Sequence, residues 1–168
     1  MPPDLLVITA SNGENLALAE RFAETGRSLG LRAEVLDLTR LDLPLFTPRQ
    51  QAAHGLPASL AALSGRLESA PRWVICTPEY NGSIPPVLTN AIAWLSVQGD
   101  DFRRLFNQRP VAIATRSGSG GQTVLTALRL QLAHLGAHVV GRQLVSNGAN
   151  PARQETIDDL LQRLQKLS

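Results

Sequence analysis

The sequence predicts an α/β fold in which helices cover both faces of a five-stranded parallel sheet. Short runs of β-branched and aliphatic residues alternate along the chain with longer segments whose apolar residues have helical spacing. The first of these runs, "LLVITA" at 5–10, is apolar almost throughout, which is typical of a strand buried on both faces. A length of 168 residues suits one domain, so we expect a single domain over 1–168.

Five strands and five helices can be placed from this alternation. We expect strands at 5–10, 32–38, 72–77, 110–115 and 138–145, and helices at 14–30, 56–67, 86–96, 122–137 and 151–168. Residues 39–56 are predicted to form a surface loop, Gly30 and Gly136 to stop helices, and Asn150 with Pro151 to start the last one. Gly141 should weaken or bulge the fifth strand. Right-handed crossovers then favour the strand order 2-1-3-4-5, the flavodoxin-like three-layer sandwich.

Composition excludes several classes of function. The formal net charge is only +2 and the arginines are scattered, so no basic stripe indicates nucleic acid. The single cysteine, Cys76, excludes an internal disulfide, and its apolar surroundings favour a buried, unreactive thiol. We find neither a secretion signal nor an apolar segment of spanning length, and we therefore expect a cytoplasmic protein with no membrane partner.

Three polar, glycine-bearing loops follow the first, third and fourth strands. They read "SNGEN", "PEYNGSI" and "RSGSGG". In a doubly wound sheet, ligands bind beyond the carboxyl ends of the strands, near the point where the strand order reverses. The three loops should therefore meet at one place and form a binding site.

The first loop places small and amide side chains where a strand gives way to a helix. Unpaired N–H groups and the positive end of the helix would suit a phosphate there. Ser11, Asn12 and Asn15 are equally good helix caps, so capping alone remains an alternative. A phosphate also requires the Glu14 carboxylate to point to solvent.

The second loop, "PEYNGSIPP", contains more chemistry than a connection needs. N–H groups around Asn81, Gly82 and Ser83 should be available to a planar acceptor, and Tyr80 offers an aromatic wall. A plain strand-to-helix turn is the alternative, with Ser83 as cap and Pro85 and Pro86 in the first helical turn.

The third loop, "SGSGGQT", is rich in glycine, so its backbone can approach a ligand closely and form an anion-favouring concavity. It has neither the lysine of a P-loop nor the spacing of a dinucleotide-binding motif. A flexible turn remains the alternative.

Two blocks of sequence carry a family resemblance. "TPEYNGSIPPVLTNAIAWLS" (77–96) and "RPVAIATRSGSGGQTVLTALRLQLAHLGAHVV" (109–140) resemble the NADPH-dependent FMN reductase family, flavodoxin-like enzymes that include quinone, azo-dye and chromate reductases. The resemblance implies an FMN site at the three loops, with NADPH or NADH as hydride donor. It also implies a small-molecule acceptor and a homodimer or homotetramer.

The residues that the resemblance assigns to FMN form three groups. The phosphate would lie in the first loop, the isoalloxazine edge on the backbone of the second, and the pyrimidine end against the third. In that order the residues are Ser11, Asn12, Asn15 and Leu16; Pro78, Glu79, Tyr80, Asn81, Gly82 and Ser83; and Ser117, Gly118, Gly120 and Gly121. The flavin supplies the redox chemistry, so no catalytic acid, base or nucleophile is expected from the protein.

Two further functions stay open at this stage. The first loop lacks the arginine and second serine common in the family, so the domain could have lost FMN and act as a binding or sensor protein. A flavodoxin-type electron carrier is the other alternative, disfavoured because such carriers tend to be strongly acidic. His134 and His138 are four residues apart, but Gly136 interrupts the helix and no carboxylate joins them, so we expect no metal.

Overall fold

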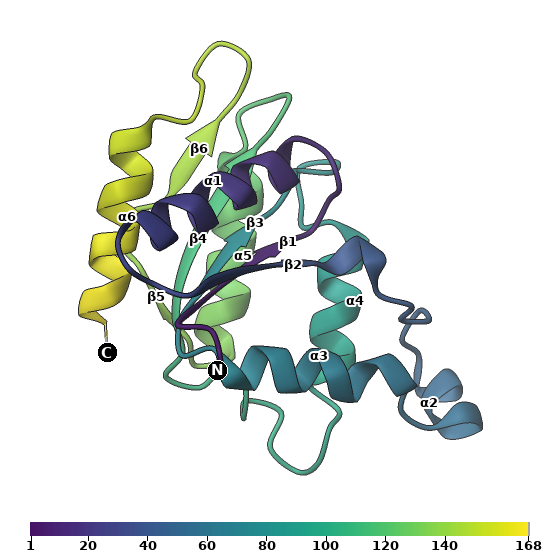
Figure 1. Ribbon diagram of the computed structural model, residues 1–168. Helices are drawn as coiled ribbons and strands as arrows, with labels where there is room; N and C mark the ends of the chain where they lie inside the picture. Colours follow the sequence, from purple (N-terminus) through teal and green to yellow (C-terminus); the bar gives the residue numbers. More distant parts are fainter. Residues whose placement is uncertain (168) are drawn as a thin grey trace.

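The computed structural model describes residues 1–167 and shows a three-layer α/β sandwich (Figure 1). The strands are β1 (Leu5–Thr9), β2 (Ala33–Asp37), β3 (Trp73–Cys76), β4 (Pro110–Arg116), β5 (His138–Val139) and β6 (Leu144–Ser146). The helices are α1 (Glu14–Ser28), the short 3-10 turn η1 (Leu38–Arg40), α2 (Pro48–His54), α3 (Ala58–Ser69), α4 (Pro86–Leu95), α5 (Gln122–His134) and α6 (Gln154–Lys166).

The sheet has the predicted topology. Its strand order is β2-β1-β3-β4-β5, with β6 also paired to β4, and every pairing is parallel. The central strand β1 is buried along its whole length, as its apolar run predicts. The flavodoxin-like order 2-1-3-4-5 is therefore confirmed.

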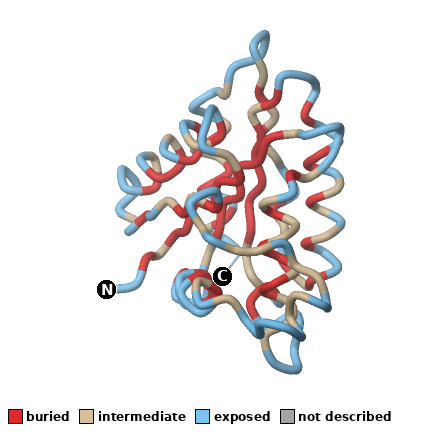
Figure 2. Tube along the Cα trace, turned by 90° about the vertical axis from the view of Figure 1, so that its right-hand side faces the viewer, coloured by how far each residue is buried: buried red, intermediate tan, exposed pale blue. Residues whose placement is uncertain are grey.

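Alternating side chains of the central strands supply two separate apolar cores. Leu6 and Ile8 of β1 point into the core beneath α3, α4 and α5, whereas Leu5 and Val7 join the core beneath α1 and α6. Figure 2 shows the consequence: the inner strands are buried, and the helices that pack on the sheet are buried along one side. This burial fixes the register of the sheet and hence the position of each strand end.

The predicted fifth strand is broken in two. His138 and Val139 pair with the first residues of β4, the chain then leaves the ladder around Gly141, and pairing resumes at Leu144. The Arg129 side chain of α5 replaces part of the lost ladder: its guanidinium donates to the carbonyl of Val140 at 2.9 Å and to the Gln143 amide oxygen at 3.0 Å. The prediction of one continuous strand was wrong, and the expected weakening at Gly141 is confirmed.

Two other expectations need correction. The segment 39–56 is not all loop: it contains α2, whose N-terminus is capped by the Thr47 hydroxyl accepting from the Gln50 N–H at 2.9 Å. The last helix begins at Gln154 rather than Pro151, after an N-cap residue, Arg153, whose side chain makes no capping bond. By contrast, Gly30 and Gly136 do stop helices, with φ of 83° and 87°.

Both tryptophans are buried within the chain. The Trp94 indole donates to the Pro44 carbonyl at 2.7 Å and packs edge-on against Phe46. Trp94 is fully buried and Trp73 is 1% exposed, so both act as packing residues of the core. Among the described residues, no helix combines the length and the apolar character that crossing a bilayer requires.

Candidate functional site

The loops after β1, β3 and β4 lie at one edge of the sheet, in the upper part of Figure 1. Since the three strands are neighbours and parallel, their carboxyl ends lie side by side. Two side chains join the loops directly: Asn15 reaches the backbone of Arg116, and Glu79 reaches Ser119. The predicted meeting of the three loops is thus present in the fold.

The first loop exposes N–H donors. No acceptor within residues 1–167 takes the N–H groups of the four residues Asn12, Gly13, Glu14 and Asn15. These are the unpaired donors at the positive end of α1, whose N-cap, Gly13, has no side chain to satisfy them. Ser11 and Asn12 lie in this loop, but neither side chain caps the helix, so the capping alternative does not hold.

Asn15 has a structural role in its side chain. It is 2% exposed, its amide nitrogen donates to the Arg116 carbonyl at 2.9 Å, and its amide oxygen accepts from the Arg116 N–H at 2.8 Å. The side chain therefore pairs with the end of β4 as another strand would. Leu16 is half-buried on α1 and lines a hollow with Val35 and Asp37, on the β2 side of the helix.

The second loop is a tight turn. Tyr80 and Ser83 exchange two backbone hydrogen bonds, of 3.1 Å and 3.0 Å. Between them Asn81 and Gly82 have φ of 51° and 71°, and positive φ at both central residues defines a type I′ turn, for which Asn-Gly is the preferred pair.

This turn reduces the number of donors that we expected. The Ser83 N–H is occupied by the Tyr80 carbonyl. Of the three expected donors, Asn81 and Gly82 keep N–H groups without an acceptor in the described chain. Ser83 also does not cap α4, which begins after Pro85 with Pro86 in its first turn. Tyr80 is 49% exposed and can serve as an aromatic wall, while Pro78 is buried beneath the loop.

The Glu79 side chain turns toward the third loop. Its carboxylate accepts from the Ser119 hydroxyl at 2.7 Å and from the Val124 N–H at 3.1 Å. These bonds, chiefly the one from Ser119, hold the pKa of Glu79 below its ordinary value. Because the N-cap residue of α5 is Gly121, which has no side chain, Glu79 supplies the cap from another loop.

The third loop combines a fixed base with open backbone. Ser117 is buried and its N–H donates to the Ser146 carbonyl at 3.0 Å, which ties the loop to the end of β6. Gly118 and Gly120 are exposed, and no residue of the described chain accepts from their N–H groups. The loop therefore offers two donors on a braced segment, rather than the flexible turn that was the alternative.

Arg116 is a neighbouring residue that the sequence did not single out. Its guanidinium lies 3.2 Å from the Glu14 carboxylate, whose side chain is 70% exposed. Glu14 thus meets the condition that it should face solvent, and its charge is offset by the arginine. The position of this arginine, at the end of β4 and first in the predicted loop "RSGSGG", was the available signal.

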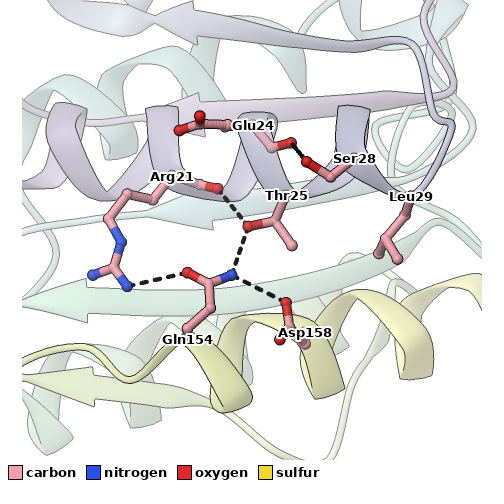
Figure 3. A pocket seen from close by; sticks show the side chains of 7 residues that line it. All are labelled: Arg21, Glu24, Thr25, Ser28, Leu29, Gln154 and Asp158. Carbon is pink, nitrogen blue, oxygen red and sulfur yellow. Dashed lines mark hydrogen bonds between the residues drawn. The ribbon is translucent and has the colours of Figure 1, made fainter.

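A shallow groove between α1 and α6 has no clear ligand-binding character. Its volume is about 400 Å³, and Figure 3 shows Gln154 joining Arg21, Thr25 and Asp158 across it. Gln154 of α6 donates to the Thr25 hydroxyl at 2.8 Å and to Asp158 at 3.0 Å, and it accepts from Arg21. These bonds join the two helices, so we assign the groove a structural role.

Metal and thiol chemistry find no support in the described residues. No group of three or more His, Cys, Asp or Glu side chains there could hold a metal ion. His134 instead stacks on Phe102 at the end of α5. Cys76 is fully buried in β3, and this burial raises the pKa of its thiol far above the ordinary value.

Comparison with known proteins places this geometry in a family. The family model described as NADPH-dependent FMN reductase matches residues 3–151. A quinone reductase of Escherichia coli strain K12 is 36% identical over 124 residues, which are 70% of this chain and 64% of that protein. An NADPH azoreductase of Bacillus sp. strain OY1-2 is 28% identical over 128 residues, covering 75% of this chain and 67% of that protein.

A solved structure supports the fold independently. The flavoenzyme NAD(P)H:(acceptor) oxidoreductase FerB of Paracoccus denitrificans superposes with a TM-score of 0.75 at 21% identity, covering 96% of this chain and 97% of that one. At this identity the likeness concerns architecture alone.

Fold and site together define a flavodoxin-like α/β protein with a candidate ligand edge where main-chain donors from three loops meet. The chain belongs to the family of NADPH-dependent FMN reductases, as the family model's match over most of its length shows. The resemblance of the two sequence blocks is therefore confirmed. The chain spans 64% of the length of the E. coli quinone reductase that it matches.

Proposed function

We propose that this protein is an oxidoreductase that binds FMN at the three-loop edge and passes reducing equivalents from NADPH or NADH to a small acceptor of the quinone, azo or flavin class. The observation that carries this proposal is the convergence of N–H donors without protein acceptors from three neighbouring strand exits. Membership of the FMN reductase family and the similarity to quinone and azo reductases support the choice of cofactor and acceptor.

The described residues fit FMN. Donors at the start of α1, from Asn12 to Asn15, suit a phosphate, and Arg116 offsets the nearby Glu14 charge. The main chain of 78–83, with Tyr80 beside it, suits the edge of a flat ring. Gly118 and Gly120 offer donors to the carbonyl-bearing end of that ring, and Ser117 and Gly121 shape the loop that presents them.

Bound FMN would supply the redox chemistry, accepting a hydride from the nicotinamide and then reducing the acceptor. The chain's own contribution is binding and orientation. Fixed N–H donors stabilise negative charge on a bound ring without reorganising, because the loops that present them are already tied together. No proton transfer by a side chain is required.

We also propose a homodimer or homotetramer in the cytoplasm. Closed symmetric assemblies are the default for proteins of this kind, and the resemblance to the family implies the same. The proposed partners are small molecules, with neither nucleic acid nor membrane among them.

Titration of the purified protein with FMN tests the proposal. We expect quenching of flavin fluorescence with one FMN per chain, and then anaerobic bleaching of the flavin absorbance by NADPH or NADH. Re-oxidation by a quinone or an azo dye should follow. No binding with FMN in large excess would refute the assignment and favour a domain that has lost its cofactor, while binding without bleaching by either nucleotide would favour an electron carrier.

A further inference from the structure

The helices α1, α4, α5 and α6 follow β1, β3, β4 and β6, and they differ in what their N-termini offer at the proposed ligand edge. Pro85 and Pro86 begin α4 and have no N–H to donate. The α6 helix follows β6 rather than a strand that ends in one of the three loops, and it packs against α1 and β4. The N-termini of α1 and α5 are therefore the two that could receive an anion at the three loops.

The N-terminus of α5 is already occupied by a carboxylate of the chain itself. Glu79 accepts from the Val124 N–H, in the first turn of α5, at 3.1 Å. Its second oxygen accepts from the Ser119 hydroxyl at 2.7 Å, and the Ser119 N–H in turn donates to Ser117 Oγ at 3.2 Å. One negative charge thus neutralises the positive end of α5 and fixes the glycine loop that precedes it.

The N-terminus of α1 is in the opposite condition. Its donors have no acceptor in the described chain, and the nearest carboxylate, Glu14, is exposed and paired with Arg116. An anion arriving at this edge would meet attraction at α1 and the Glu79 charge at α5. The two helix ends are therefore electrostatically unequal.

We propose that Glu79 is a positioning residue: its side chain holds the glycine loop of 117–121 in place for the ring, while the phosphate lies at α1, away from the Glu79 charge. This inference rests on the proposed function, because the ligand it orients is FMN. The carboxylate itself touches no ligand. Its role is to hold the loop whose N–H groups face the ring of the ligand.

The experiment compares FMN with riboflavin, which lacks the phosphate. In Glu79→Ala we expect the affinity for both ligands to fall by the same factor, about tenfold, because the loop loses its cap and a charged hydrogen bond while the phosphate end is untouched. Glu79→Gln keeps an acceptor for Val124 and should recover part of this loss. If Glu79→Ala lowered affinity only by disturbing packing elsewhere in the fold, Glu79→Gln would not recover the affinity.

The ratio of the FMN affinity to the riboflavin affinity tests where the phosphate lies. If Glu79→Gln strengthens FMN binding but leaves riboflavin unchanged, the phosphate lies near α5 and the proposal is wrong. Unchanged affinity for both ligands in Glu79→Ala would overturn it as well. Glu155→Gln is the matched control, because Glu155 is an exposed carboxylate in the first turn of α6, and it should alter neither affinity.

A measurement without flavin separates this inference from the proposed function. In the flavin-free protein, amide hydrogen exchange over 119–124 should be faster in Glu79→Ala than in the wild type, and intermediate in Glu79→Gln. Failure of the wild type to bind FMN would refute the function and leave this exchange result standing. Equal exchange in all three proteins would refute the positioning role, whatever the flavin does.

Discussion

Gly121 shows how tightly the third loop is constrained at the scale of a single residue. Its φ is +72°, and a Cβ there would lie 2.7 Å from Thr115 Cγ2 and 3.1 Å from Ser117 Cβ. Left-handed backbone costs an alanine about 1 kcal/mol or more, and overpacking adds a similar amount. We therefore expect Gly121→Ala to lower the free energy of unfolding by about 2–4 kcal/mol, measured by chemical denaturation.

Gly118 gives the control within the same loop. A Cβ at this position meets no atom within 4 Å, and its φ is not in the left-handed region. The Gly118→Ala protein should be as stable as the wild type or more stable by up to about 1 kcal/mol. Equal losses in the two variants would show that the loop does not have the backbone described above.

Residue roles were the part of the site that sequence could predict least. The type I′ turn at Asn81 and Gly82 is a local signal, yet its consequence for Ser83 depends on which backbone groups pair across it. Asn15 and Glu79 were assigned to the ligand because they lie in the right loops. Their side chains have partners 101 and 40 or more residues away, and no local pattern indicates such partners.

At the scale of elements, the gap between β5 and β6 is bridged by the side chain of Arg129 from α5. Burial lowers the pKa of Arg129, whose fork of donors spans the Val140 carbonyl and the Gln143 side chain. Lysine keeps the charge but lacks the fork. Arg129→Lys should therefore lower the free energy of unfolding by about 1–2 kcal/mol and speed amide exchange at Val140 and in β6.

The control for this variant is Arg163→Lys. Arg163 donates to Asp159 at 2.7 Å from an exposed position on α6, so the change should be within about 0.5 kcal/mol of neutral. If Arg129→Lys leaves exchange at Val140 and β6 unaltered, then the guanidinium does not hold the break, and β4 pairing alone would account for it.

The elements that sequence missed share one property: little apolar burial. No residue of α2 is buried, so no apolar stripe marked it, and the Thr47 cap with Pro48 was the only signal. The start of α6 was misplaced because Asn150 and Pro151 imitate a cap and first turn. In the structure the Asn150 N–H instead joins a turn closed by Asn147 Oδ1 at 2.8 Å.

At the scale of the whole molecule, the fold was predictable because both cores follow from strand alternation. A parallel sheet whose inner strands are apolar on both faces must be covered by helices on both faces, and the handedness of the crossovers then leaves few strand orders. The same reasoning predicted that the three loops meet, since the topology alone brings the ends of β1, β3 and β4 together. The hydrogen bonds between loops could not be predicted in this way, because they depend on side chains rather than on topology.

Stability should depend on pH because several carboxylates accept hydrogen bonds that lower their pKa values in the folded state. Asp4 accepts from the Arg32 side chain at 2.6 Å and 2.9 Å and from its N–H at 3.0 Å, linking the start of β1 to the start of β2. These bonds hold the pKa of Asp4 well below its ordinary value, and similar bonds lower the pKa values of Asp159 and Glu79. A carboxyl whose pKa is lower in the folded state favours folding once the unfolded chain is ionised, and that contribution disappears as the pH falls toward the folded-state pKa.

We therefore expect the free energy of unfolding to fall as the pH is lowered from about 5 to 2, with Asp4 contributing part of the slope. Asp4→Asn should be less stable than the wild type at pH 7, and urea denaturation at successive pH values should show the two curves converging at the acid end. Asp100, which makes no ion pair in the described part of the chain, provides the control: the Asp100→Asn curve should run parallel to the wild type. A constant gap between Asp4→Asn and wild type from pH 7 to pH 2 would show that the Asp4–Arg32 contacts act through packing, independently of the carboxylate's charge.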